Sequence, residues 1–166
     1  MKREIQHKTC SKCSFLKPVA EFYYHRTRKC YMESCKLCNN AISTKYGASQ
    51  RSACNPRFLL MVRAGDIRRR AKLLGIPVMP KLSRYLLSLW ESQCGLCFYT
   101  GRSMTLNGGY HRDDSAATVD RIKPEDGYVE GNLAICTALV NRVKQNLSIN
   151  DLISLVGEIR QHVTGG

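Results

Sequence analysis

Hydrophobic and polar positions in the last third of the chain follow first the period of a strand and then that of a helix. Residues 117–122 are rich in strand formers, residues 124–127 have turn chemistry, and residues 133–136 form a second apolar run. Thr137 is suited to cap a following helix, whose apolar stripe is Leu139, Val140, Val143 and Leu147. The pattern predicts strand, turn, strand and helix.

Three further segments have apolar residues at helical spacing. Asn55 followed by Pro56 is typical of a helix start, and Gly75 closes that segment. Its predicted inward stripe is Leu60, Ala64, Ile67, Ala71 and Leu74, and its polar face carries Arg63, Arg68, Arg69, Arg70 and Lys72. A short helix is expected at 83–93 and a last one at 148–163. We expect the last helix to give packing support, with these side chains inward: Leu152, Ile153, Val156, Ile159 and Val163.

The charge of the chain lies in its first half. Residues 1–80 carry 17 Lys and Arg against four acids, whereas residues 81–166 carry nine against nine. This asymmetry predicts a polyanion as partner, with double-stranded DNA as the first choice. Arg68, Arg69 and Arg70 would then follow its phosphates, the alternative being a solvated basic face. The sequence has no basic amphipathic helix with bulky aromatic residues and no apolar run of about 18 residues. We therefore do not expect it to bind or cross a membrane.

Nine cysteines and no apolar export segment at the start indicate thiolates on metal in a reducing compartment, hence a cytoplasmic protein of a bacterial or phage-infected cell. Cys10-x-x-Cys13 and Cys35-x-x-Cys38 have the repeated spacing of a four-sulfur zinc site. Cys30 is a rival to Cys35, and a redox or free-thiol role is the alternative. Aromatic residues between the pairs form a layer too small to fold alone, so metal binding and folding should be coupled.

A second, weaker metal hypothesis concerns the later cysteines. Cys94, Cys97 and Cys136 offer three thiolates for a second zinc, and Cys54 or His111 is a candidate fourth ligand. If no metal binds there, these cysteines should pack as small hydrophobic residues.

The predicted strand-turn-strand-helix segment brings Asp120, Asn132 and Asn141 within reach of one another. A carboxylate and a facing amide oxygen suit a hard divalent cation that keeps most of its waters. The segment resembles the HNH endonucleases, whose core is a ββα-metal finger, and the residues that carry the resemblance are Asp120-Arg121-Ile122, Asp126-Gly127-Tyr128, Gly131-Asn132 and Asn141-Arg142-Val143-Lys144.

The resemblance implies roles for individual residues. Asp120 and Asn141 would hold Mg²⁺ or Mn²⁺, Asn132 would brace the loop, and Arg121 with Lys144 would clamp the phosphate. The family most often has Asp-His where this chain has Asp120-Arg121, and a protonated arginine cannot act as the general base. His111 or solvent is the candidate replacement.

Together these patterns predict a small α+β protein, with a ββα-metal finger packed with helices and a zinc-ribbon-like module before it. The expected organisation is a zinc module at 1–46, a linker at 47–56, a basic helical segment at 57–93 and a nuclease domain at 94–166. The predicted function is a metal-dependent DNA endonuclease that nicks as a monomer and needs a homodimer to cut both strands. The alternatives are a non-catalytic zinc-containing nucleic-acid-binding protein on an HNH-like scaffold and, with less support, a zinc-held protein adaptor.

Overall fold

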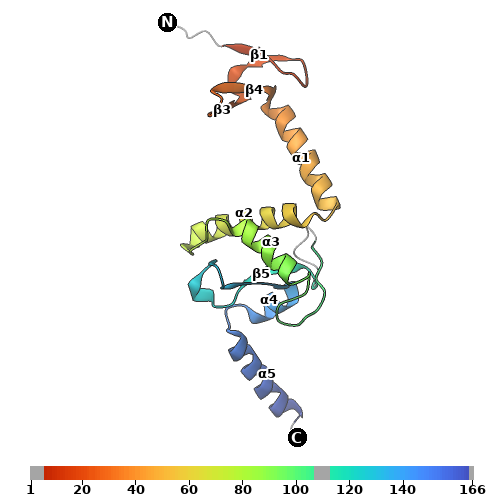
Figure 1. The fold of residues 1–166 in the computed structure, drawn as a ribbon, viewed down its shortest axis with the longest axis vertical. Helices are drawn as coiled ribbons and strands as arrows, with labels where there is room; N and C mark the ends of the chain where they lie inside the picture. The colour runs from red at the N-terminus through yellow and green to blue at the C-terminus, as the bar shows by residue number, and fades with distance from the viewer. Residues whose placement is uncertain (1–5, 107–112, 165–166) are drawn as a thin grey trace. The chain divides into compact units, whose positions relative to one another are not determined.

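The computed structural model describes residues 6–106 and 113–164, and its contacts divide the chain into two compact units between Ser52 and Ala53. Each unit mixes helices with small antiparallel sheets (Figure 1). The first unit contains β1 (His7–Thr9), β2 (Leu16–Pro18), the 3-10 helix η1 (Val19–Glu21), β3 (Phe22–His25), β4 (Cys30–Cys35) and α1 (Lys36–Ser52). The second contains α2 (Pro56–Leu74), α3 (Leu82–Ser92), β5 (Ala117–Arg121), the 3-10 helix η2 (Pro124–Asp126), β6 (Leu133–Thr137), α4 (Ala138–Lys144) and α5 (Ile149–Thr164). The predicted small α+β class is confirmed.

The first unit consists of two hairpins and one helix around a very small core. β1 pairs with β2 and β3 pairs with β4, both antiparallel. The buried residues of the core are Cys10, Phe22 and Cys35, with Cys13 and Cys38 packed against them. One phenylalanine and a group of cysteines bury too little apolar surface to hold a fold of this size by the hydrophobic effect alone. A metal held by the cysteines would supply the missing stabilisation.

The predicted linker at 47–56 is mostly helical. α1 begins directly after Cys35 and continues to Ser52, and α2 begins at Pro56. The small and polar residues of this segment were the basis for expecting a linker, but alanine, serine and glutamine also tolerate a helix. Only a few residues between the two helices lie outside regular structure.

The helix at 56–74 forms as its sequence predicts. The Asn55 side chain accepts a hydrogen bond from the Phe58 backbone N–H, and Gly75 ends the helix in the left-handed region at φ 66°. Four of the five residues in the predicted stripe are buried, whereas Leu74 in the last turn is exposed. Arg63, expected on the polar face, is instead buried, because α2 packs against α3 on one side and the sheet on another.

The core of the second unit lies between α2, α3 and the β5–β6 hairpin. Its buried residues include Leu60, Ile67, Leu86, Leu133 and Ile135. The Gln93 side chain donates to the Ile135 carbonyl and accepts from its N–H, which fastens the end of α3 to β6. The sheet is therefore held rigidly on the face toward the helices.

β5, β6 and α4 reproduce the predicted order of strand, strand and helix. The strands pair antiparallel, with Asp120 opposite Ala134. The Thr137 hydroxyl accepts from the Val140 N–H and caps α4 as expected. The orientation of α4 differs from the prediction, because Leu139 and Val143 are exposed and Lys144 is buried. The helix is only seven residues long, and its inward face is set by the polar contacts of Lys144 rather than by the apolar stripe.

α5 does not pack as predicted. Ile153, Val156, Ile159 and Val163 were expected inward, but 54–72% of each side chain is exposed. None of the helix residues is buried among the described parts of the chain. A period of 3.6 predicts that a helix has an apolar face, but it does not identify what covers that face. No helix among residues 6–106 and 113–164 combines the length and apolarity needed to cross a bilayer.

Candidate functional site

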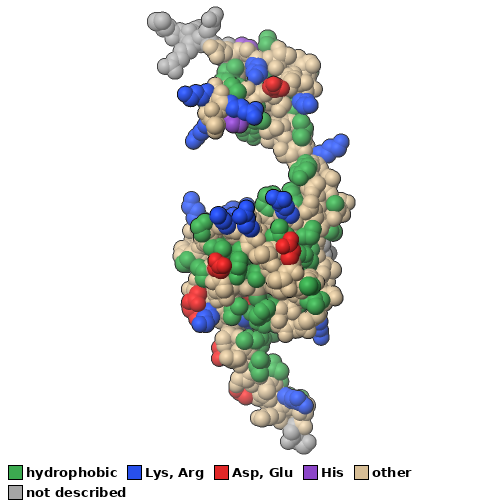
Figure 2. Space-filling model, viewed as in Figure 1, with side chains coloured by type: hydrophobic (Ala, Val, Ile, Leu, Met, Phe, Trp, Pro, Cys, Tyr) green, Lys and Arg blue, Asp and Glu red, His purple; other side chains and the backbone are tan. Residues whose placement is uncertain are grey.

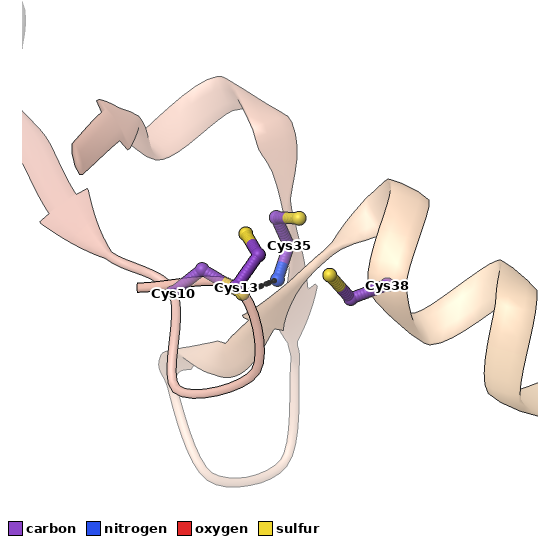
Figure 3. A group of neighbouring side chains, drawn as sticks. All are labelled: Cys10, Cys13, Cys35 and Cys38. Carbon is purple, nitrogen blue, oxygen red and sulfur yellow. Dashed lines mark hydrogen bonds between the residues drawn. The ribbon is translucent and has the colours of Figure 1, made fainter. Parts of the chain in front are cut away.

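Four cysteines of the first unit meet at one point (Figure 3). The sulfur atoms of Cys10, Cys13, Cys35 and Cys38 all lie within 4.8 Å of one another. Cys10 and Cys13 come from the loop after β1, Cys35 ends β4, and Cys38 lies in the first turn of α1. Thiolate sulfur in a set of four is the donor chemistry of structural zinc, so the cluster fits the predicted zinc site. Cys30 lies exposed at the start of β4, outside the cluster.

Hydrogen bonds prepare this cluster for a cation. The Cys10 sulfur accepts the backbone N–H of Cys35 at 3.2 Å and that of Lys12 at 3.4 Å. The Cys35 N–H contributes most to lowering the pKa of Cys10 to about 6. Contacts with the neighbouring Cys35 and Cys13 side chains raise the pKa of Cys38 to about 12. Neighbouring thiols resist ionising together, because their negative charges would repel one another. A bound divalent cation would offset these charges and convert the thiols to thiolates.

The later cysteines do not form a second cluster. Among the described residues, no second group of three or more His, Cys, Asp or Glu side chains lies close enough to share an ion. Cys94 and Cys54 are exposed, whereas Cys97 and Cys136 are buried. Burial raises the pKa of the Cys136 thiol to about 12. The predicted fourth ligand His111 lies outside the described residues.

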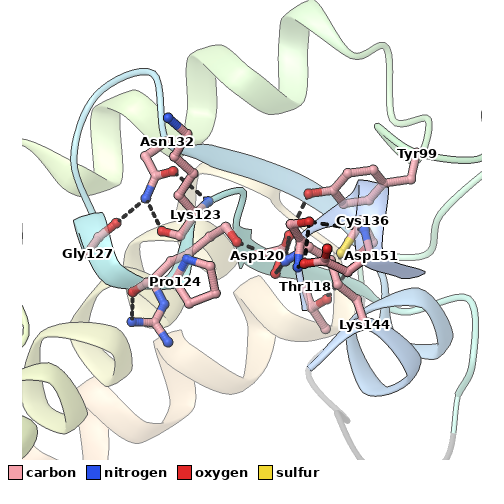
Figure 4. Close-up of polar contacts among 12 residues, drawn as sticks. Tyr99, Thr118, Asp120, Lys123, Pro124, Gly127, Asn132, Cys136, Lys144 and Asp151 are labelled. Carbon is pink, nitrogen blue, oxygen red and sulfur yellow. Dashed lines mark hydrogen bonds and ion pairs between the residues drawn. The ribbon is translucent and has the colours of Figure 1, made fainter. Parts of the chain in front are cut away.

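Asp120 lies at the centre of a polar network (Figure 4). Its Oδ2 accepts the Tyr99 hydroxyl at 2.6 Å, and the Lys144 ammonium lies 3.1 Å from Oδ2 and 3.2 Å from Oδ1. Lys144 also donates to the Arg121 carbonyl at 3.0 Å. Burial and the Asp120 carboxylate raise the pKa of Tyr99, so this hydroxyl keeps its proton and remains a donor. The side chains of β5 and α4 are thereby tied together.

Lys144, which was predicted to clamp the phosphate, is buried in the structure. Its side chain is completely buried and its ammonium group is engaged by Asp120 and Arg121. An ammonium group in this environment requires partners to offset its desolvation, and β5 supplies them. A phosphate would have to displace these contacts to reach it.

Asp120 and Asn141, which the sequence predicted to lie within reach of one another, both line the same cavity. The cavity has a volume of about 210 Å³, and its wall also includes Arg70, Arg121 and Tyr128. Asp120 comes from β5, Asn141 from the middle of α4 and Arg70 from the last turns of α2. Nearly all of the wall is polar, and two arginines stand beside one aspartate and three amide residues, Asn141, Gln145 and Asn146. The site therefore combines groups that accept a cation with groups that attract a phosphate.

Arg121 is held in place beside this cavity. Its Nη1 donates to the Pro124 carbonyl at 2.8 Å, and its guanidinium lies 5.3 Å from the centre of the Tyr128 ring. Tyr128 itself is fixed by backbone hydrogen bonds to Pro77 and Met79. Gly127 allows this close approach, because a Cβ there would lie 2.8 Å from the Pro77 carbonyl oxygen. Arg121 thus contributes a fixed positive charge to the wall.

Asn132 braces the loop between β5 and β6, which agrees with the role implied for it. Its amide oxygen accepts the Lys123 N–H, and its NH₂ group donates to the Lys123 and Gly127 carbonyls, each at 2.8 Å. The side chain is buried and all three contacts lie within the loop. Its contribution to the site is to fix the backbone that positions Arg121.

The three arginines predicted to follow a phosphate backbone differ in position. Arg68 donates to the Pro80 carbonyl, and Arg69 forms an exposed ion pair with Asp66. Only Arg70 lines the cavity. Figure 2 shows that Lys and Arg side chains gather along α2, so the helix presents a basic surface even though its arginines have separate contacts.

Tyr99 is an important member of the site that was not identified from the sequence, and Lys144 was identified but with a different role. Tyr99 follows the Cys94–Cys97 turn and carries no local pattern that points to Asp120. Lys144 stands three residues after Asn141, so a shared helical face was the available signal, but nothing in the sequence indicated its burial.

Comparisons of the chain with family models, with curated proteins and with solved structures found no match. The functional interpretation therefore depends on the residues and on their arrangement.

Proposed function

We propose that this chain is a metal-dependent endonuclease that hydrolyses a phosphodiester bond of DNA, with β5, β6 and α4 as a ββα-metal finger. The observation that carries the proposal is the cavity shared by Asp120 and Asn141 and flanked by Arg70 and Arg121. A carboxylate and an amide from facing elements, beside two guanidinium groups, match the requirements of a cation and a phosphate together.

The donor set fits a weakly held ion. Mg²⁺ and Mn²⁺ are bound by few protein oxygens and keep several waters, and Asp120 and Asn141 offer one carboxylate and one amide. Both carboxylate oxygens lie within hydrogen-bonding distance of Lys144, and one of them also accepts from Tyr99. The ion would share a carboxylate whose charge is already partly neutralised, so we expect activity to need millimolar rather than micromolar metal. When bound, the ion would offset negative charge at the phosphate and the leaving oxygen.

The other side chains would position the substrate. Arg70 and Arg121 would hold the phosphate from two directions, and Asn132 would keep the Arg121 loop fixed. Lys144 would orient the Asp120 carboxylate rather than touch the substrate. The proton of the attacking water would pass to solvent or to His111, because arginine at position 121 cannot accept it.

A second candidate function is non-catalytic binding of nucleic acid on the same scaffold. The observation that favours it is the buried Lys144–Asp120 pair, because a carboxylate neutralised by lysine has less charge to offer a cation. The basic first half of the sequence serves binding equally well under both proposals.

Supercoiled plasmid distinguishes the two. The purified chain is incubated with plasmid in Mg²⁺, in Mn²⁺, or in a chelator that removes both ions, with zinc then supplied again for the four-cysteine site. The fraction of relaxed circles is quantified in each case. Metal-dependent nicking supports the endonuclease. Salt-sensitive retardation of the plasmid without any nicking, at every metal concentration up to tens of millimolar, supports the binding protein.

A further inference from the structure

A second concave site lies entirely within the first unit, whereas the cavity described above belongs to the second. It has a volume of about 370 Å³ and is formed by the loop between Cys10 and Cys13 on one side and the β3–β4 hairpin on the other. We call it the hairpin groove. Its wall includes Lys12, His25, Arg28, Cys30, Tyr31 and Glu33.

The two sides of the hairpin groove are fixed to each other. The Ser11 N–H donates to the Glu33 carbonyl at 2.9 Å, and the Cys35 N–H donates to the Cys10 sulfur. At the hairpin tip, the Arg28 N–H donates to His25 Nδ1 at 3.2 Å, which leaves Nε2 as the ring atom available to a ligand. A metal on the four cysteines would fix the Cys10–Cys13 side further.

The charge of the hairpin groove favours an anion. Lys12 and Arg28 are both exposed, and neither forms an ion pair within the described part of the unit. Glu33 is the single acid of the wall. Residues 6–52 as a whole carry nine Lys and Arg against two acids. Figure 2 shows basic side chains gathered over the β3–β4 hairpin, so the surroundings reinforce the preference of the wall.

Tyr31 gives the hairpin groove an aromatic surface. Its side chain is 36% exposed, and the Tyr24 ring supports it edge-on at 5.1 Å. A ring held in this way and exposed toward a basic groove is the combination by which proteins bind unpaired bases, since stacking requires a free base face. Bases within a duplex have no free face to offer.

From this arrangement we propose that the hairpin groove binds an unpaired nucleotide, with its base on Tyr31 and its phosphates against Lys12 and Arg28. The volume of about 370 Å³ lies near the lower end of the range for small-ligand sites, about 300–1,000 Å³, which suits one nucleotide. The inference rests on the proposed function, because it takes nucleic acid as the partner. It restricts the substrate of the proposed endonuclease to nucleic acids with an unpaired segment.

Binding is measured apart from cleavage, so that the two proposals can fail separately. The full chain loaded with zinc, in buffer without Mg²⁺ or Mn²⁺, is titrated into fluorescein-labelled single-stranded DNA of about 12 nucleotides, the same sequence as RNA, and the corresponding DNA duplex. Anisotropy gives the affinity for each. Tyr31→Leu removes the ring but keeps the apolar bulk, and Tyr31→Phe keeps the ring.

We expect Tyr31→Leu to weaken single-strand binding roughly tenfold and to change duplex binding less than about twofold, while Tyr31→Phe binds like the parent. Lys12→Ala with Arg28→Ala should weaken single-strand binding further and lower its salt dependence. Lys45→Ala removes one charge of the same unit outside the groove and is the matched control. Comparing the affinities for DNA and for RNA of the same sequence shows whether the site prefers deoxyribose or ribose. Zinc content, measured by mass spectrometry, confirms that the first unit of each variant is folded.

Two results would overturn the proposal. One is a parent that binds duplex at least as tightly as single strands. The other is a set of zinc-loaded groove variants, the double charge variant included, that binds single strands as Lys45→Ala does. Neither result bears on the endonuclease proposal, because this experiment measures binding and the endonuclease is tested by plasmid nicking.

Discussion

Lys144 on α4 and Asp120 on β5 form an ion pair that is almost completely shielded from solvent. The ammonium lies 3.1 Å from Oδ2, and the exposed fractions of the two side chains are 0% and 4%. The pair closes the junction of strand and helix from inside, while the same strand and helix present Asp120 and Asn141 to the polar cavity. Stability and the candidate chemistry therefore share one carboxylate.

Removing the ammonium should destabilise the second unit strongly. Lys144→Met fills a similar volume but leaves the Asp120 carboxylate buried with only Tyr99 as a partner. We expect a loss of roughly 3–5 kcal/mol in the free energy of unfolding, measured by urea denaturation. Arg69→Ala breaks an ion pair whose arginine is 74% exposed and should cost at most about 1 kcal/mol. Equal effects of the two substitutions would show that the buried pair is not structural.

The exposed apolar face of α5 predicts a contrast between two isoleucines. Ile135→Ala opens a cavity in the core and should cost roughly 2–5 kcal/mol. Ile159, which is 54% exposed, should cost no more than about 0.5 kcal/mol when replaced by alanine, because its side chain already contacts water. Urea denaturation of both variants tests this. A large, concentration-dependent effect of Ile159→Ala would mean that α5 is covered in solution.

Acidification should release metal from the first unit. The backbone N–H of Cys35 is the main cause that lowers the pKa of Cys10 to about 6. Cys10 is therefore a thiolate at neutral pH and becomes a thiol as the pH falls through that value. Contacts with neighbouring cysteines raise the pKa of Cys38 to about 12, so zinc must displace its proton at pH 7.

We expect zinc retention to fall as the pH is lowered toward and below about 6, and zinc added to metal-free protein at pH 7 to release protons. A zinc-sensitive dye and an unbuffered titration measure the two effects. Cys30→Ser is the matched control, because Cys30 lies outside the cluster. Zinc bound independently of pH from 5 to 8 would argue against a four-thiolate site.

Two neighbouring arginines test the cavity against the basic surface. Arg70 lines the cavity, whereas Arg69, the residue before it on the same helix, forms an ion pair with Asp66. Arg70→Ala should lower the nicking rate roughly a hundredfold or more, the range for loss of one charge-stabilising donor, while Arg69→Ala should lower it less than about twofold. Plasmid relaxation under saturating metal measures both. Equal losses would indicate that α2 acts only as a general basic surface.

The sequence predicts elements better than it predicts orientations. Caps identify where helices begin, so Asn55 and Thr137 place α2 and α4 correctly. Periodicity gives each helix an apolar face, but in α4 the polar partners on β5 turn Lys144 inward, and in α5 the apolar face remains exposed. Paired cysteines locate the first cluster because their spacing is itself the ligand geometry.

The cavity shows the same division. Asp120 and Asn141 are placed together by the order of strand, strand and helix, which local patterns reveal. Arg70 and Tyr99 reach the site from distant parts of the chain. Only the packing of α2 and of the segment after Cys97 brings them there, and no local pattern records it.

The most direct test of the endonuclease proposal is metal-dependent nicking by Asn141→Ala. Asn141 is half-buried, and its side chain makes no hydrogen bond among the described residues, so the substitution should leave folding and DNA binding unchanged. Asp120→Ala would be less informative, because it leaves Lys144 buried without its partner. We predict that Asn141→Ala, at unchanged unfolding midpoint, loses at least about 90% of plasmid nicking in Mg²⁺ or Mn²⁺, because even residues that only support a metal ligand cost about 10–100-fold in activity when they are replaced. Nicking at the parent rate by this variant would contradict the proposed site.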